Sequence, residues 1–274
     1  MQLIYTFPLL LLFILILVPC LMVGLAGVWL VRRYDWMLDP EDNGTAALAH
    51  AFVGVLYAVA LGLMVVGVQS GYTEVEMVVM KEAYLAGDLY IDSEGLSAQG
   101  GLEIQELTKQ YVDAVIEKEW PAISAGNLVE QETRSIIDKL SHRIITYETR
   151  TDRDLVVYAE LLSGINDLLD QRRERLHLGV DGVGVVTWMV VTMGALITIG
   201  MAWFYNTRGT RAHYGLVASM SLMFGLMIFL IIAMDHPLWG QFSVTSAPFK
   251  EVQRNIGKWE KEFDIKRGVI NGET

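Results

Sequence analysis

The chain has 274 residues, of which 53% are hydrophobic and only 19% charged, and its formal net charge at pH 7 is −11. This composition excludes a disordered chain and a collagen, the single cysteine excludes a disulfide scaffold, and the acidic balance argues against nucleic-acid binding by a basic surface. A mean hydropathy of +0.36 predicts a multi-pass membrane protein.

Four uncharged runs follow one another along the chain. They are Pro8–Val31, Ala46–Ser70, Gly182–Tyr205 and Tyr214–Met234. A helix rises about 1.5 Å per residue, so each run can cross a hydrocarbon core of about 30 Å. We therefore expect an all-α membrane protein with four transmembrane helices: two within residues 1–70, at about 8–31 and 46–70, and two within residues 179–236, at about 182–205 and 214–234.

The segment between the second and third runs, residues 71–178, carries 21 acidic and 11 basic side chains. Its apolar residues recur with a helical period, which predicts an acidic, extramembrane helical domain. No strong breaker separates the second run from residue 91, so we expect that helix to continue out of the membrane. Breaks are expected at 93–95, 100–101, 120–121, 126–127 and 149–151, with Thr151 or Asp152 capping the last helix.

The tail, residues 237–274, is polar, and apolar side chains recur in it at helical spacing from Phe249 to Phe263. It is expected outside the membrane, as a helix on the extramembrane domain or at the lipid interface. Arginines follow the first run and lie between the third and fourth. By the positive-inside rule these short loops face the cytoplasm, which would place the helical domain and both termini on the outer, periplasmic side of a cell inner membrane.

Polar residues near the ends of the runs are the candidate pore or interface residues, because burying them in lipid needs a reason. They are His50, Asp181, Arg172, Arg173, Arg175, Asp235 and His236. The three arginines either anchor at lipid headgroups or form an anion-attracting ring at a pore mouth. His50 is either hydrogen-bonded to a neighbouring helix or faces a pore. Asp181 suits the capping of a helix N-terminus, and Asp235 could pair with the arginines.

Enzymatic chemistry has no support in the sequence. No nucleophile constellation, di-iron pattern or phosphate loop is present, and no histidine has metal-ligand spacing with a second histidine or a cysteine. We therefore expect no enzymatic activity, no cofactor and no metal.

The segment after the fourth run, Asp235-His236-Pro237-Leu238-Trp239-Gly240, resembles the signature that follows the last span in the bacterial bestrophin-like family, with Leu238 in place of the usual Phe. Further matches occur in the same order along the chain. They are Arg32-Arg33, Asn43, Leu56-Tyr57, Gly62-Leu63, Glu119-Trp120-Pro121, Arg172-Arg173, Arg175-Leu176, Ser243-Val244 and Pro248-Phe249.

This resemblance implies four spans with a helical domain between the second and third. Bestrophins are oligomeric anion channels whose helical domain is cytosolic, which is opposite to the sidedness that the loop charges predict. The resemblance favours an oligomeric anion channel; the alternative is a non-conducting accessory or scaffolding subunit that binds a partner protein. In either case the expected surroundings are the lipid bilayer and a homo-oligomer or a larger membrane complex, without nucleic acid.

Overall fold

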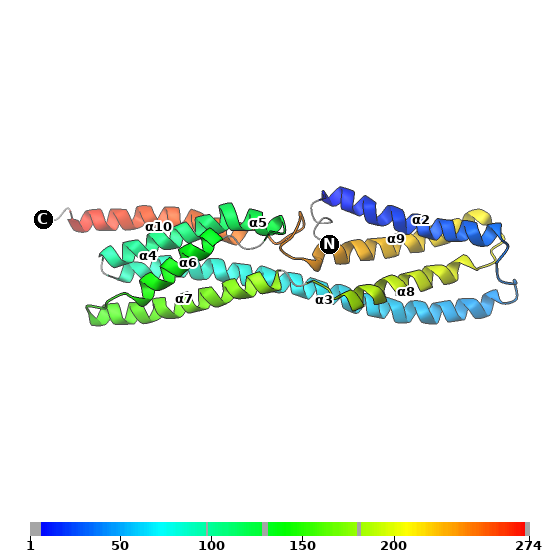
Figure 1. The fold of residues 1–274 in the computed structure, drawn as a ribbon, viewed down its shortest axis with the longest axis horizontal. Coiled ribbons are helices and arrows are strands. Elements are labelled where there is room, and N and C mark those ends of the chain that lie inside the picture. Colours follow the sequence, from blue (N-terminus) through cyan, green and yellow to red (C-terminus); the bar gives the residue numbers. More distant parts are fainter. Residues whose placement is uncertain (1–6, 97, 128–130, 180–181, 272–274) are drawn as a thin grey trace. The chain divides into compact units, whose positions relative to one another are not determined.

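A computed structural model describes residues 7–96, 98–127, 131–179 and 182–271. The chain divides into two compact units (Figure 1). Unit 1 holds the described residues up to Tyr72 and from Gly182 to His236. Unit 2 holds the described residues from Thr73 to Gly179 and from Pro237 onward. No strand occurs in the ranges that the structure describes, so the all-α prediction is confirmed.

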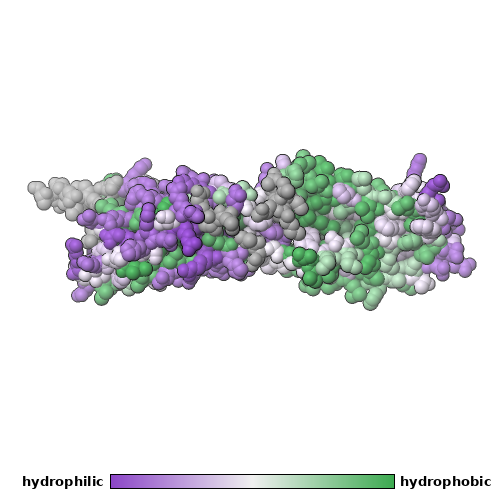
Figure 2. All heavy atoms as spheres, in the orientation of Figure 1, coloured by the Kyte–Doolittle hydropathy of each residue, from purple (hydrophilic) through white to green (hydrophobic). Residues whose placement is uncertain are grey.

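Unit 1 contains the four apolar helices. They are α2 (Leu9–Arg33), the first part of α3 (Asn43–Asp92), α8 (Val185–Trp203) and α9 (Thr210–Asp235). All four are long and apolar enough to cross a membrane. On the face that Figure 2 shows, the surface of these helices is mostly hydrophobic, with hydrophilic residues at one end. The four predicted spans are thereby confirmed as helices.

Small residues let the helices of unit 1 approach closely. A side chain on Gly27 would lie 2.0 Å from the Trp203 indole, and one on Gly24 would lie 2.0 Å from the Ser221 hydroxyl. Lipid chains are as apolar as leucine, so helices gain little from hiding apolar surface from them and depend on close van der Waals contact instead. The glycines therefore decide where α2 meets α8 and α9.

Hydrogen bonds join the loops at the arginine-containing end of unit 1. Asn43 exchanges two hydrogen bonds with the backbone of Asn206, at 2.8 and 3.1 Å. Arg32 donates from Nε to Nδ1 of His213, at 3.1 Å, and His213 Nε2 lies 3.0 Å from the carbonyl oxygen of Ala202. An arginine nitrogen can only donate, so Nδ1 of His213 is the acceptor and its proton is on Nε2. These contacts fix the loops that follow α2 and α8.

Unit 2 is a bundle around the second part of α3, which leaves unit 1 without a break. The other elements are η1 (Ser93–Gly95), α4 (Ala98–Ala114), the π-helical segment η2 (Val115–Glu119), α5 (Trp120–Ser124), α6 (Gln131–Ile145), α7 (Asp152–Leu178) and α10 (Ala247–Asn271). Its core is aliphatic and aromatic, with fully buried Ile104, Leu140, Ile165 and Phe249. The extension of the second span to residue 91 is confirmed by α3.

Two expected breaks in this domain are wrong. Gly100 and Gly101 lie in the first turn of α4, where a side chain on Gly101 would lie 2.4 Å from the carbonyl oxygen of Ser93. These glycines therefore permit a close approach and do not end a helix. The chain also stays helical through Trp120 and Pro121, because Pro121 falls at the start of α5, where its missing N–H costs least.

The remaining predictions for unit 2 agree with the structure. A 3-10 turn occupies 93–95, Gly126 turns the chain with a φ of 77°, and the Thr151 side chain accepts from the backbone N–H of Asp154 as the cap of α7. The tail helix α10 lies in unit 2, where Lys109 of α4 binds Glu260 and Gln253 donates to Asp113. Of the two places expected for the tail, the structure gives the extramembrane bundle.

Candidate functional site

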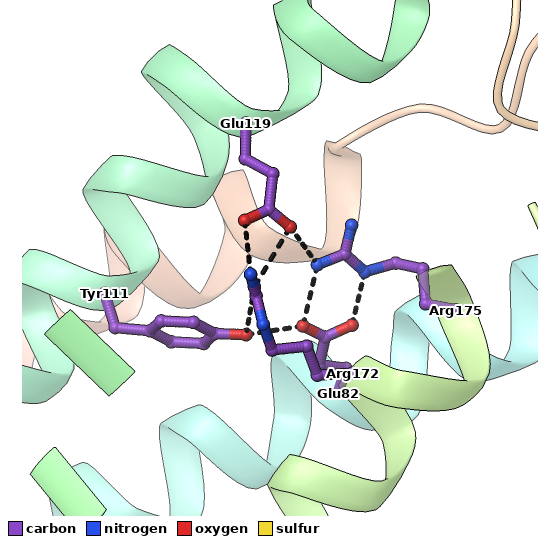
Figure 3. A network of polar contacts seen from close by, with 5 residues as sticks. All are labelled: Glu82, Tyr111, Glu119, Arg172 and Arg175. Carbon is purple, nitrogen blue, oxygen red and sulfur yellow. Dashed lines mark hydrogen bonds and ion pairs between the residues drawn. The ribbon is translucent and has the colours of Figure 1, made fainter. Parts of the chain in front are cut away.

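Five polar side chains meet in the interior of unit 2 (Figure 3). Glu82 comes from α3, Tyr111 from α4, Glu119 from the end of η2, and Arg172 and Arg175 from α7. We call these five residues the buried ion network. It joins four elements that are far apart in the sequence.

The two arginines bind the two carboxylates in a closed arrangement. Arg172 donates from both terminal nitrogens to the two oxygens of Glu119, at 3.0 and 2.8 Å. Arg175 donates to both oxygens of Glu82, at 2.5 and 3.0 Å, and to Glu119 at 2.6 Å. The Tyr111 hydroxyl donates to Glu82 at 2.5 Å. Planar guanidinium groups suit such paired contacts with carboxylates better than lysine does.

The network is removed from water. The side chains of Glu82, Glu119 and Arg175 are 0% exposed, and that of Arg172 is 6% exposed. Two positive and two negative charges leave no net charge in the interior. Isolated buried charges cost several kcal/mol each, and only complete pairing offsets that cost. The network is therefore tolerated as a set, and loss of one member leaves another uncompensated.

Burial and charge act in opposite directions on the carboxyl of Glu119. Burial raises the pKa of Glu119, but Arg175 and Arg172 lower it by more than burial raises it. The pKa of Glu119 therefore falls below its usual value. Burial lowers the pKa of Arg175, yet Glu82 and Glu119 raise it well above the usual range. Burial is the main cause that raises the pKa of Tyr111, and the charge of Glu82 adds to this increase. At neutral pH all three keep the protonation that the hydrogen bonds require.

Aromatic rings complete the surroundings of the two arginines. The Arg175 guanidinium lies over the Trp120 ring, 5.3 Å from its centroid, and that of Arg172 lies 5.8 Å from the centroid of Tyr111. Nη1 of Arg175 has no hydrogen-bond acceptor. The face of an aromatic ring attracts a cation, so Trp120 supplies the contact that no oxygen provides on this side.

The local sequence explains how these side chains reach the interior. Glu82 lies on the face of α3 that also carries the buried Val75, Val79 and Ala86. Arg172 and Arg175 are three residues apart and share a face of α7 with buried Leu168. Glu119 ends the π-helical segment η2 and lies four residues after the buried Val115, on the same side of the helix.

Both carboxylates of this arrangement are engaged by the arginines. Each carboxylate oxygen of Glu82 and Glu119 accepts at least one hydrogen bond from an arginine. Across the described part of the chain, no three His, Cys, Asp or Glu residues are grouped to hold a metal ion. The network is suited to holding α3, α7 and η2 in one fixed arrangement.

The predicted roles of Arg172 and Arg175 at lipid headgroups or a pore mouth are wrong, because both side chains lie inside unit 2 and bind carboxylates. The reason is that helix α7 directs these two positions toward its own bundle. Arg173, between them, is 73% exposed and pairs with Asp170 at 2.7 Å. Of the three arginines, only Arg173 remains available at the surface.

Asp235 and His236 close unit 1 after α9. Asp235 accepts from the backbone N–H of Val183 at 2.5 Å and lies 3.3 Å from Nδ1 of His236, whose ring contacts Gly182. Asp235 therefore joins the end of α9 to the segment before α8. Within unit 1 the partners of Asp235 are Val183 and His236, and its expected pairing with the arginines stays a prediction. Asp181 lies outside the described residues.

His50 is hydrogen-bonded to Tyr205, with 3.1 Å between Nδ1 and the hydroxyl, and the two rings are stacked. Tyr205 donates its only hydroxyl proton to the carbonyl oxygen of Ala46, so His50 Nδ1 must be the donor to Tyr205. The sequence offered a hydrogen bond to a neighbouring helix as one of two alternatives, whereas Tyr205 lies in the loop after α8. A pore-facing role for His50 remains a prediction.

Sequence reasoning did not identify Glu82, Glu119 and Tyr111 as a site. Glu82 had a detectable signal, because it interrupts an apolar face of a helix at a position where every other residue is buried. Glu119 also had a signal, because it lies four residues after the buried Val115 and seven after the buried Val112, on the same face of a helix, and it begins the Glu119-Trp120-Pro121 match.

Comparison with known proteins gives one family and several structures. The model of the Bestrophin-like domain matches residues 18–249. No curated protein matches the sequence. Two crystal structures of single-residue variants of a bacterial Bestrophin homolog from Klebsiella pneumoniae are similar, each with a TM-score of 0.62 and 12% identity over 89% of this chain and 97% of that chain. A variant described as a membrane protein gives a TM-score of 0.64 with the same identity and coverage. At this identity the structures establish the fold alone.

Proposed function

The chain belongs to the bestrophin-like family, and we propose that it is an integral membrane protein that assembles with copies of itself into an anion channel. The family model covers most of the chain, and the fold follows that of bacterial bestrophin homologues along 97% of their length. Bestrophins are oligomeric channels, and we propose the same assembly for this chain.

The observation that carries the proposal is the exposed surface of α3. Only 11% of its apolar window is buried within the chain. Gly54, Gly62 and Gly67 have open space where a side chain would be. Glycines in a membrane helix usually permit close contact with another helix, and the described residues of this chain supply no such contact here. A second copy is the partner that a homo-oligomer offers.

A pore within one subunit has little support. The polar groups in the spans are used locally: Tyr57 donates to the carbonyl oxygen of Val191 at 2.8 Å, and Thr198 and Ser221 donate to carbonyls in their own helices. Ion conduction needs a wet path lined by groups that replace water. We infer that several subunits together surround this path, as expected for a ring.

Ion flux in liposomes tests the proposal. Purified protein is reconstituted, and chloride and potassium fluxes are measured separately, because the acidic charge of residues 71–178 would repel anions from any pore mouth it faces. Chloride flux from a ring-shaped oligomer supports the proposal. Potassium flux without chloride flux overturns the anion assignment. The absence of both, with a monomer or a stable complex with another protein, favours a non-conducting accessory or scaffolding subunit.

A matched pair of variants connects flux to α3. Gly62→Trp fills open space on α3, and Gly215→Trp fills open space on α9. We expect Gly62→Trp to reduce flux at least tenfold at an unchanged thermal unfolding midpoint, and Gly215→Trp to leave flux within about twofold, in line with the geometric role of glycine contacts. Equal effects of the two variants would contradict the role of α3.

The sidedness of the membrane is a separate part of the proposal, with a cell inner membrane as the location. The loop arginines favour an outward helical domain, whereas the bestrophin resemblance favours a cytosolic one. A variant that replaces the native cysteine (Cys20→Ser) and introduces one on the exposed face of α6 (Lys139→Cys) decides between the two orientations. Labelling of intact cells by an impermeant maleimide places unit 2 outside, and labelling only after cell lysis places it inside.

A further inference from the structure

Two helices of unit 2 have outer faces of opposite charge. On α10, Lys250, Arg254, Lys258 and Lys261 are all exposed and follow one another at intervals of four, four and three residues. This spacing places them on one side of the helix, which we call the basic strip. The opposite side of α10 is buried in the bundle and includes Phe249, Val252 and Ile256.

The basic strip has no acidic partner of its own. In the ranges that the structure describes, none of its four side chains is paired with a carboxylate, although Lys109 of α4 does bind Glu260 of the same helix. The exposed Glu251 and Glu262 lie on a neighbouring side of α10. The strip spans about 16 Å at 1.5 Å per residue.

The outer face of α7 carries the complementary charge. Glu160, Asp167 and Glu174 are exposed and lie at intervals of seven residues, and we call them the acidic strip. The buried Leu161 and Leu168 each follow a member of the acidic strip and lie on the adjoining side of α7. The acidic strip spans about 21 Å, so the two strips are of similar length.

One copy of the chain cannot bring its own strips together, because α3 lies between the two helices. Gly87 of α3 faces Val252 and Trp259 of α10, whereas Leu89 of α3 faces Gly164 of α7. Within unit 2, α10 and α7 run along opposite edges of the bundle in Figure 1. The strips therefore lie on helices on different sides of α3.

We propose that the basic strip of one copy docks on the acidic strip of the next copy. Two different surfaces on opposite sides of a subunit make a heterologous contact, which closes into a ring when the rotation allows it. This inference rests on the proposed oligomer and names the surfaces that join its extramembrane parts. It also accounts for how acidic units approach one another, because the basic strip is where an acidic neighbour is attracted and not repelled.

Charge reversal with rescue tests the contact. One variant carries K250E, R254E, K258E and K261E, a second carries E160K, D167K and E174K, and a third combines both sets. Full-length protein in neutral detergent at about 50 mM salt is analysed for its oligomeric fraction by light scattering. We expect either set alone to lower that fraction about tenfold, and the combination to restore it to within about twofold, since the strips attract again with signs exchanged. Thermal midpoints confirm that each variant is folded.

The control reverses exposed charges elsewhere in unit 2, with R134E and K139E on α6, and is expected to leave the oligomer unchanged. An oligomer that survives both reversals overturns the contact, and the channel proposal stands if flux persists. A loss that the combination does not restore also overturns it, and a requirement for anionic lipid would then identify headgroups as the occupant of the basic strip. A wild-type protein that is monomeric overturns both proposals.

Discussion

The two units achieve a fixed structure by different means. In unit 1 the close contacts are made by glycines, such as Gly24 against Ser221 and Gly27 against Trp203. In unit 2 an aliphatic core surrounds five polar side chains that bind one another. The same helix, α3, passes through both units and changes its character between them.

The surrounding solvent explains this difference. Burial of apolar surface from water contributes about 25 cal/mol per Å², so the core of unit 2 forms readily but does not by itself define one arrangement. Between helices in lipid that contribution is nearly absent, and the shape of the contact decides the packing. In unit 2 the buried ion network selects one arrangement of the helices, because only one arrangement satisfies all its charges.

The strongest way to break this comparison is to remove one charge from the network. Arg175→Met keeps the length of the side chain but leaves Glu82 without its main partner in a site that water does not reach. Breaking a buried pair in this way costs about 3–5 kcal/mol. We expect a large fall in the thermal unfolding midpoint of the full chain in detergent.

Arg173→Met is the matched control for that variant. Arg173 is exposed and pairs with Asp170 at the surface, so its loss is expected to change stability by less than about 0.5 kcal/mol. If both variants lowered the midpoint equally, the buried ion network would not be what holds the helices of unit 2 in one arrangement.

The fold was largely predictable, because it depends on signals that are long in the sequence. Uncharged runs of more than 20 residues have few explanations besides membrane helices, and a helical period identifies the extramembrane bundle. Breaks were harder to predict. Gly100 and Gly101 suggested a break, yet they serve close contacts inside α4, and a single sequence does not distinguish the two uses of glycine.

The pH dependence of Glu119 sharpens the comparison. The folded-state pKa of Glu119 is lowered, so its contribution to stability is fully present above its ordinary value of about 4.5 and is lost as the pH falls through the lowered pKa. Glu119→Gln keeps one acceptor and removes the charge, and we expect it to cost about 2 kcal/mol at pH 7. The difference in midpoint between wild type and variant should shrink as the pH falls below 4.5. A difference that stays constant down to pH 2 would contradict the ionic role.

The site was predictable only in part, for a physical reason. Arg172 and Arg175 were singled out, but their closeness to the third span suggested headgroups, whereas the direction of a side chain depends on the rotation of α7. That rotation is set by packing against residues far away in the sequence. Glu119 lies at helical spacing from the buried Val115, which indicates an inward position but not its partners on α7.

Unit 1 has its own test in Gly27→Val. The first added atom would already lie 2.0 Å from the Trp203 indole, so α2 or the ring must move. Overpacking of this kind costs about 1–3 kcal/mol. Gly215→Val on α9, where the space is open, is the control and is expected to leave the midpoint nearly unchanged. Thermal unfolding in detergent measures both, and an equal response would show that shape does not decide the packing of unit 1.

The smallest expected effect concerns Asp92, the last residue of α3. Burial, Asp88 and Glu160 all raise its pKa, so the charged form disfavours folding once the pH exceeds the ordinary value of about 3.8. A carboxylate at a helix C-terminus adds to this effect. Asp92→Asn should therefore raise the midpoint by about 1 °C at pH 7, a small gain because solvent screens a partly exposed group, and the gain should vanish near pH 3. Asp138→Asn on the exposed face of α6 is the control. If the gain at pH 7 persisted at pH 3, removal of the charge would not be its cause. The charge of Asp92 would then not destabilise unit 2, unlike an unpaired charge in the buried ion network.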